Sequence, residues 1–183
     1  MSIIDSIRGE YLRYKQLAEA AIAQVSEEHL SAAPNEESNS IAMVCWHVSG
    51  NLKSRFTGFL TSDGEKPWRN RDEEFDARTA SRSALLAKWE EGWAALMSAL
   101  SELSDDQLHR DVTIRGQALS VIEALHRSLA HTSYHVGQIV YLAKEKVGTG
   151  WTSLSIPRGK SADFNLNPAG QKPAEHVARL DPK

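Results

Sequence analysis

Three histidines in this sequence have a spacing that could support chemistry. His131 and His135 are four residues apart within a long segment of helical apolar periodicity. On an α-helix both imidazoles therefore project from one face, one turn apart, where they can coordinate one cation. His47 lies in a second periodic segment, and a helical bundle could bring it against the other two. The spacing predicts a site for a divalent metal ion made of His47, His131 and His135.

A second interpretation is that the same residues are core histidines with hydrogen-bonded rings. An imidazole among apolar residues needs a partner, because burying an unpaired polar group costs free energy. Asn51 follows His47 on its helix face, and Gln138 follows His135. The pattern alone leaves metal binding and structural histidines both open.

The other histidines need no special role. His126 is nine residues before His135 and half a helical turn away, so we expect it to point off the site. His29, His109 and His176 stand in polar, turn-like or tail sequence, and we expect them to be solvated.

Three imidazoles would leave coordination positions open, which is typical of a catalytic rather than a structural metal site. A bound ion would lower the pKa of a water molecule or of a substrate thiol. Imidazole ligands suit zinc and nickel equally. Thr132 stands where the HExxH motif has its glutamate, so no carboxylate lies beside the histidines in the sequence and we expect no metalloprotease.

Four periodic segments must position these residues. The expected helices are residues 3–24, a second from the N-cap Ser40 to about Leu60, a third from about Thr79 to Leu103, and a fourth from the capping box at Ser120 to about Lys146. Aromatic residues in the third, such as Trp89 and Trp93, are expected in the core.

Between and after these helices we expect less regular structure. Residues 61–76 predict a connection that Trp68 pins to the bundle, and Asp111–Gly116 predicts a short extended piece. Prolines and glycines after residue 147 make another long helix improbable. The sequence thus predicts an all-α four-helix bundle over residues 1–147, with an irregular C-terminal tail over 148–183 that packs on the bundle or frays from it.

Composition excludes several classes of function. The 183 residues include 21 basic and 24 acidic side chains spread along the chain, so no basic stripe is available for nucleic acid. No apolar run approaches the roughly 18 residues of a membrane span, and the N-terminus does not resemble a signal peptide. The one cysteine, Cys45, cannot form an intrachain disulfide and is expected to be a small buried hydrophobe, which fits the cytoplasm.

The histidine segments resemble those of the DinB/YfiT-like superfamily. The resemblance rests on residues 46–48 (WHV) and 130–138 (AHTSYHVGQ) and spans about residues 1–147. Residues 151–165 (WTSLSIPRGKSADFN) are similar to the tail of one DinB-like subgroup of uncharacterised bacterial proteins. The resemblance implies a four-helix bundle whose metal-binding histidine triad falls on His47, His131 and His135.

What the resemblance implies about function is broad. Similar bundles include thiol-dependent transferases and isomerases that use bacillithiol, mycothiol or glutathione, and many form homodimers. We therefore expect a metal-dependent thiol transferase or hydrolase acting on a small molecule. Arg158 and Lys160 could contact an anionic substrate if the tail folds over the metal, or could be solvated charges. The alternative is a non-catalytic helical bundle that serves dimerisation or partner binding, with structural histidines.

Overall fold

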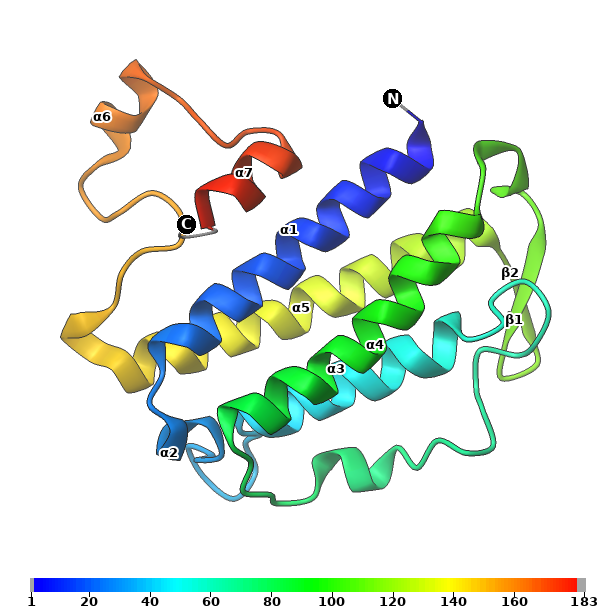
Figure 1. Ribbon diagram of the computed structural model, residues 1–183, viewed down its shortest axis with the longest axis horizontal. Helices are drawn as coiled ribbons and strands as arrows, with labels where there is room; N and C mark the ends of the chain where they lie inside the picture. The colour runs from blue at the N-terminus through cyan, green and yellow to red at the C-terminus, as the bar shows by residue number, and fades with distance from the viewer. Residues whose placement is uncertain (1, 181–183) are drawn as a thin grey trace.

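The computed structural model describes residues 2–180, which form a bundle of four long helices (Figure 1). The long helices are α1 (Ile3–Gln24), α3 (Ile41–Phe56), α4 (Arg82–Glu102) and α5 (Val121–Val147). The shorter elements are α2 (Glu27–Leu30), η1 (Asp72–Phe75), η2 (Asp105–Gln107), β1 (Asp111–Ile114), β2 (Gln117–Ser120), η3 (Gly148–Gly150), α6 (Ser161–Leu166) and α7 (Pro173–Leu180). The predicted all-α class is confirmed.

The direction of the helices determines how the chain connects them. α1 and α5 run one way, and α3 and α4 run the other way (Figure 1). Because α3 and α4 are parallel, residues 57–81 must return along the length of the bundle before α4 begins. This connection includes η1, which packs against α3. The predicted connection is therefore present, but it contains one turn of 3₁₀-helix that was not expected.

Serine caps begin the helices where the sequence predicts. The Ser40 side chain accepts a hydrogen bond from the Met43 backbone N–H at 3.2 Å, and Ser120 forms a reciprocal capping box with Glu123. α3 ends at Phe56 rather than near residue 60, because the chain turns away at Gly58, where φ is +57°.

A close crossing fixes α3 against α4. A Cβ atom on Gly92 of α4 would lie 2.6 Å from the Cα of Ser49 in α3, so the two backbones can meet only at glycine. The Gly92 N–H donates to Ser49 Oγ at 3.1 Å, and the Ser49 hydroxyl donates to the Lys88 carbonyl. This crossing holds the part of α3 that carries His47, two residues before Ser49.

The core contains the aromatic residues that the third periodic segment predicts. Trp89 and Trp93 are fully buried, and Tyr11 packs edge-on against Trp93. The Tyr11 hydroxyl donates to the Leu125 carbonyl at 3.1 Å, which joins α1 to α5. Cys45 is fully buried as expected, and burial raises the pKa of its thiol, so it is a packing residue.

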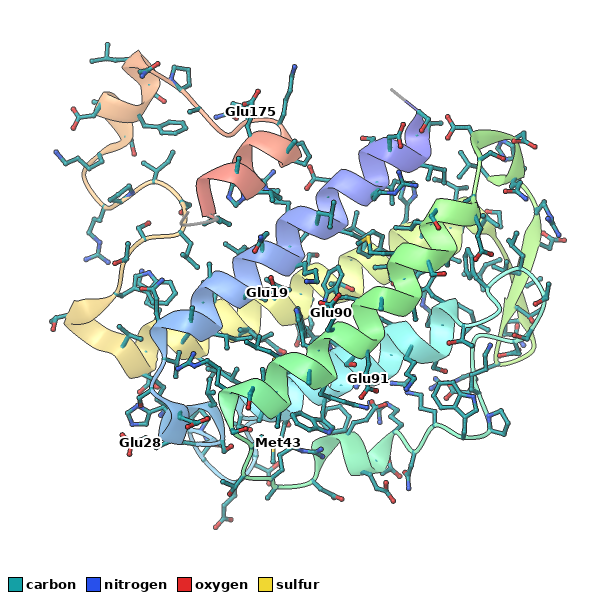
Figure 2. All side chains as sticks on the ribbon, viewed as in Figure 1. Glu19, Glu28, Met43, Glu90, Glu91 and Glu175 are labelled. Atoms are coloured by element: carbon teal, nitrogen blue, oxygen red, sulfur yellow. The ribbon has the colours of Figure 1, made fainter. Side chains whose placement is uncertain are left out.

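Polar contacts also join the helices at the surface. Lys15 of α1 lies 2.7 Å from Glu19 and 2.8 Å from Glu90 of α4, two carboxylates labelled in Figure 2. Half-exposed ion pairs of this kind contribute little stability each. Their positions show that the Lys15 side of α1 lies beside the Glu90 side of α4.

The predicted extended piece is the first strand of a hairpin. β1 pairs with β2 in antiparallel register, with Ile114 opposite Gln117. Arg115 and Gly116 have positive φ values of 55° and 71°, which a tight two-residue turn requires. The second strand was not predicted, because its four residues end at Ser120, which is itself the N-cap of α5.

The C-terminal tail has two short helices, and no long helix forms after Val147 within the described residues, as expected. α7 packs against α1, where Pro173 approaches Gly9 (Figure 1). His176 of α7 is buried, so the expectation that it is solvated is wrong; packing against α1 covers it. Across residues 2–180, no helix is both long and apolar enough to cross a membrane.

Candidate metal centre

α3 and α5 bring the three predicted histidines into one cluster. One ligand atom from each of His47, His131 and His135 lies within 4.8 Å of the other two. The Nε2 atoms of His47 and His131 are 3.1 Å apart, and the rings of His131 and His135 have centroids 4.5 Å apart. His47 and His135 are buried, and His131 is half-buried. A cluster of this composition could hold a metal ion.

η1 supplies a carboxylate that orients His47. Glu74 Oε2 lies 2.9 Å from His47 Nδ1, so Nδ1–H donates to the carboxylate and the Nε2 lone pair faces the other histidines. Arg69 donates to both Glu74 oxygens, through Nε and Nη2 at 2.8 Å each. Burial acts to raise the pKa of Glu74, but the hydrogen bonds from Arg69 and His47 outweigh it and hold that pKa below its usual value. Glu74 is therefore ionised.

The approach of Glu74 to α3 depends on Gly50. A Cβ atom at this position would overlap Glu74 Oε1 and would lie 2.8 Å from Glu74 Cδ. The next residue of η1, Phe75, places its ring centroid 4.7 Å from that of His47. Residues of the connection thus orient the imidazole from two sides.

His135 is oriented within its own helix. Its Nδ1–H donates to Gln138 Oε1 at 2.7 Å, which leaves the Nε2 lone pair free. His131 differs, because its Nδ1 is buried and has no hydrogen-bond partner among residues 2–180. Two of the three rings therefore have a fixed tautomer.

The electrostatic environment keeps the α5 histidines uncharged. Burial lowers the pKa of His131 to about 3, and the neighbouring His135 and His47 add repulsion against a second charge. Burial also lowers the pKa of His135, against an opposing contribution from Gln138. Neutral imidazole is the form that binds metal ions.

The donor set fits a divalent metal ion. Because the His47 Nε2 lone pair faces His131, the two rings can bond only if His131 carries its proton on Nε2. His131 Nδ1 is then a buried acceptor without a partner among the described residues. With the proton on Nδ1 instead, two lone pairs face each other at 3.1 Å. A cation bound by these nitrogens removes the conflict between the lone pairs, while His131 Nδ1 has no partner among the described residues in either tautomer.

Two residues of the site were not predicted from the sequence, Glu74 and Arg69. Trp68 was expected to pin the connection, but its side chain is 54% exposed, and buried Arg69 and Glu74 hold the connection instead. No carboxylate was expected beside the histidines. This holds for their neighbours in the sequence, but the fold brings the carboxylate of Glu74 next to His47. Both oxygens of Glu74 already accept hydrogen bonds, so this residue does not supply the general base of a metalloprotease.

The remaining expected positions lie away from the cluster. His126 is exposed on α5, as predicted. Arg158 and Lys160 are exposed in the tail, and Lys160 pairs with Asp163 at 3.0 Å. Neither tail residue lines the cavity beside the histidines.

Fold and site together define a helical-bundle protein with a three-histidine cluster that could hold a metal ion. The chain belongs to the family described as "Protein of unknown function (DUF1572)", whose sequence profile matches residues 1–160. Its fold is similar to the crystal structure of the conserved protein of locus from Enterococcus faecalis. The TM-score is 0.60 at 18% identity, over 81% of this chain and 99% of that chain. At this identity the likeness concerns the fold alone. No curated protein matches the sequence.

Proposed function

We propose that this chain is a DinB/YfiT-like metalloprotein in which His47, His131 and His135 bind one divalent ion, zinc or nickel. The observation that carries the proposal is the convergence of three imidazole ligand atoms within 4.8 Å. The resemblance of both histidine segments to the DinB/YfiT-like superfamily supports the same assignment.

The tautomers of the rings support a metal site of the catalytic type. Glu74 and Gln138 each accept the Nδ1–H of a histidine, so the Nε2 lone pairs of His47 and His135 are available for coordination. Three protein ligands leave room for a further one. When bound, the ion supplies the positive charge that lowers the pKa of a thiol or a water molecule at the site.

The reaction class we propose is metal-dependent transfer to or from a low-molecular-weight thiol, of the bacillithiol, mycothiol or glutathione type, or a related hydrolysis. In either reaction Glu74 and Gln138 act by orienting imidazoles. Glu74 accepts from His47 through Oε2 and from Arg69 through both oxygens, and the Gln138 amide oxygen accepts from His135, so a proton taken from substrate by either side chain would disturb these contacts.

The test is elemental analysis of protein purified without a polyhistidine tag. We expect about one zinc or nickel ion per chain in the wild type and loss of that ion in His131→Ala and His135→Ala. His126→Ala is the matched control, because it removes an exposed histidine from the same helix. Circular dichroism should show that all variants remain helical.

The same experiment also tests the rival function, a non-catalytic bundle with structural histidines. If the wild type takes up no ion even after addition of zinc or nickel, the metalloprotein assignment is wrong. The rival also predicts that a chelator leaves thermal stability unchanged.

Two further expectations belong to the proposed function. We propose that the protein is cytoplasmic, because its one cysteine is a buried packing residue with no disulfide partner in the chain. We also propose a homodimer, as is common in similar bundles, and gel filtration with light scattering tests that prediction.

A further inference from the structure

A small cavity opens directly beside the histidine cluster. Its volume is about 180 Å³, and His47 and His131 form one end of it. α3 and α5 are antiparallel, so residues that follow His47 face residues that precede His131 (Figure 1). The facing rows are Asn51 and Arg55 on α3, and Arg127 and Ser128 on α5. The cavity is therefore a continuation of the candidate metal centre along the groove between two helices.

Arginine is the dominant polar residue of this cavity. The lining contains five arginines and, among the described residues, no aspartate or glutamate. The arginines are Arg55, Arg69, Arg71, Arg115 and Arg127. The lining also includes Phe56, Phe59 and Ile114, which form an apolar part of the wall.

The two inner arginines are held by carboxylates behind the wall. Arg55 has a side chain that is 12% exposed and lies 3.2 Å from Glu65. Arg69 is bound by Glu74, as described above. Burial lowers the pKa of Arg55, and repulsion from Arg69 and Arg115 adds to this effect against the attraction of Glu65. An arginine nevertheless stays protonated, so the inner wall keeps its charge.

At the rim the positive charge is less fully compensated. Arg115 shares Glu65 with Arg55, at 2.8 Å, and Arg71 lies 3.9 Å from the exposed Asp72. Among the described residues, three carboxylates lie within 4.0 Å of these five guanidinium groups, those of Glu65, Glu74 and Asp72, and Asp63 accepts from the Arg115 backbone N–H. The cavity has an excess of positive charge next to a cluster of neutral imidazoles.

Arg127 is the one arginine of this cavity that has no partner among the described residues. It lies on α5 one turn before His131, on the same helix face, and it is exposed at the cavity. Among residues 2–180 it makes no hydrogen bond or ion pair, whereas each of the other four lies within 4.0 Å of a carboxylate oxygen. Its five N–H donors are free for a ligand.

We propose that this cavity binds the anionic group of a small substrate, a carboxylate or a phosphate on a molecule with a short apolar part, and that Arg127 is its principal binding residue. A guanidinium group matches both oxyanions with two parallel hydrogen bonds. The excess positive charge attracts the anion, and the phenylalanine rings pack against the apolar part.

The inference deepens the proposed function, and it rests on that function for the statement that the bound anion is a substrate. A ligand held by Arg127 extends along α5 towards His131, one helical turn away. Its other end, such as a thiol or a scissile bond, then reaches the histidine cluster. The anionic contact comes from the bundle itself, whereas the sequence alone left open a contact from Arg158 and Lys160 of the tail.

The experiment is a calorimetric titration of the 183-residue protein with three probes: succinate, inorganic phosphate and the neutral succinamide. The variants are Arg127→Gln, which removes the charge, and Arg127→Lys, which keeps the charge without the planar fork. Arg13→Gln is the matched control, because it removes one half-exposed arginine from α1, which contributes no residue to the cavity. Metal content is measured on the same samples.

We expect succinate or phosphate to bind the wild type and succinamide not to bind. Arg127→Gln should lower the affinity for the anion by about tenfold or more, and Arg127→Lys should lower it by less. Arg13→Gln should leave this affinity unchanged. The anion that binds more tightly identifies the class of substrate. Because Arg127 has no partner within residues 2–180, thermal unfolding of its variants should match the wild type.

Two results would overturn the inference: anions that bind no better than succinamide, or an Arg127→Gln variant that titrates like Arg13→Gln. The latter includes the case of an anion that binds only to the metal. Failure of the proposed function has a different signature, which is absence of zinc and nickel from protein that still binds the anion through Arg127.

Discussion

The two halves of the histidine cluster are built in different ways. On α5, His131, His135 and Gln138 lie within about two turns of one helix, so helix geometry alone sets their spacing. On α3, His47 depends on Glu74, which is 27 residues away in the sequence and belongs to the connection. Glu74 in turn depends on Arg69 of the same connection.

This difference separates a local half from an assembled half. The local half persists wherever α5 is helical, whereas the assembled half needs residues 57–81 to be packed against α3. The hydrogen-bond acceptors of the two halves also differ. His47 donates to a buried carboxylate, whereas His135 donates to a neutral amide. A carboxylate partner raises the basicity of a ligating imidazole more than an amide does. We therefore expect changes in the assembled half to have the larger effects.

Glu74→Ala should have the largest effect. The substitution leaves the Arg69 side chain, which is 2% exposed, with only Glu65 at 4.0 Å. Removing one partner of a buried ion pair leaves an uncompensated charge, so we expect a loss of about 3 kcal/mol in the free energy of unfolding. Urea denaturation followed by circular dichroism measures it. Asp72→Ala, which removes a 97% exposed carboxylate from the same turn, should change little. Equal losses for the two variants would contradict the view that Glu74 holds the connection in place.

Removal of the proposed metal ion should act mainly on the assembled half. At a free zinc concentration about 100 times the dissociation constant, binding stabilises the folded state by about 2.7 kcal/mol. A chelator should therefore lower the melting temperature. It should also speed hydrogen exchange at residues 69–75 more than in α5, since the connection reaches the cluster only through His47 and α3. Uniform protection changes along the chain would instead indicate that the two halves respond as one unit.

The local half of the site could be predicted from the sequence more completely than the assembled half. The i, i+4 spacing of His131 and His135 is a local pattern, and the helix that carries it begins at the predicted capping box of Ser120. His47 could be included because it is a histidine on an apolar helix face and because its segment resembles that of a known superfamily. The fold class followed from apolar periodicity in four segments.

Glu74 could not be placed, because no sequence period relates a residue of a connection to a helix 27 residues earlier. The one available signal was energetic: a histidine in an apolar face needs a partner for its second nitrogen, and Asn51 was only the nearest candidate on α3. Trp68 is the large apolar residue of the connection, but the charged side chain of Arg69 beside it is the one that is buried.

A pair of glycine substitutions tests the two halves on equal terms. Gly50→Ala on α3 should push the Glu74 carboxylate away from His47 and lower metal affinity by about tenfold. Gly137→Ala on α5 is its counterpart, since a Cβ there meets nothing within 4 Å. It should leave metal affinity unchanged and stabilise the helix by up to about 1 kcal/mol. Competition with a chromophoric zinc chelator measures both affinities. A Gly50→Ala variant with wild-type affinity would show that the Glu74 contact does not tune the site.

The smallest effect should come from making the local half resemble the assembled one. Gln138→Glu places a carboxylate where His135 Nδ1 now donates to an amide oxygen. The introduced charge should make His135 Nε2 a better donor to a cation and add direct attraction, so we expect metal affinity to rise by less than about tenfold. The gain is limited because Gln138 is half-buried and the new carboxylate has no arginine beside it comparable to Arg69. Gln138→Leu removes the acceptor and should lower affinity, which controls for loss of the amide. If Gln138→Glu also lowered metal affinity, desolvation of the carboxylate would outweigh its effect on His135. The contribution of the assembled half to metal affinity would then depend on the Arg69–Glu74 pair rather than on the carboxylate alone.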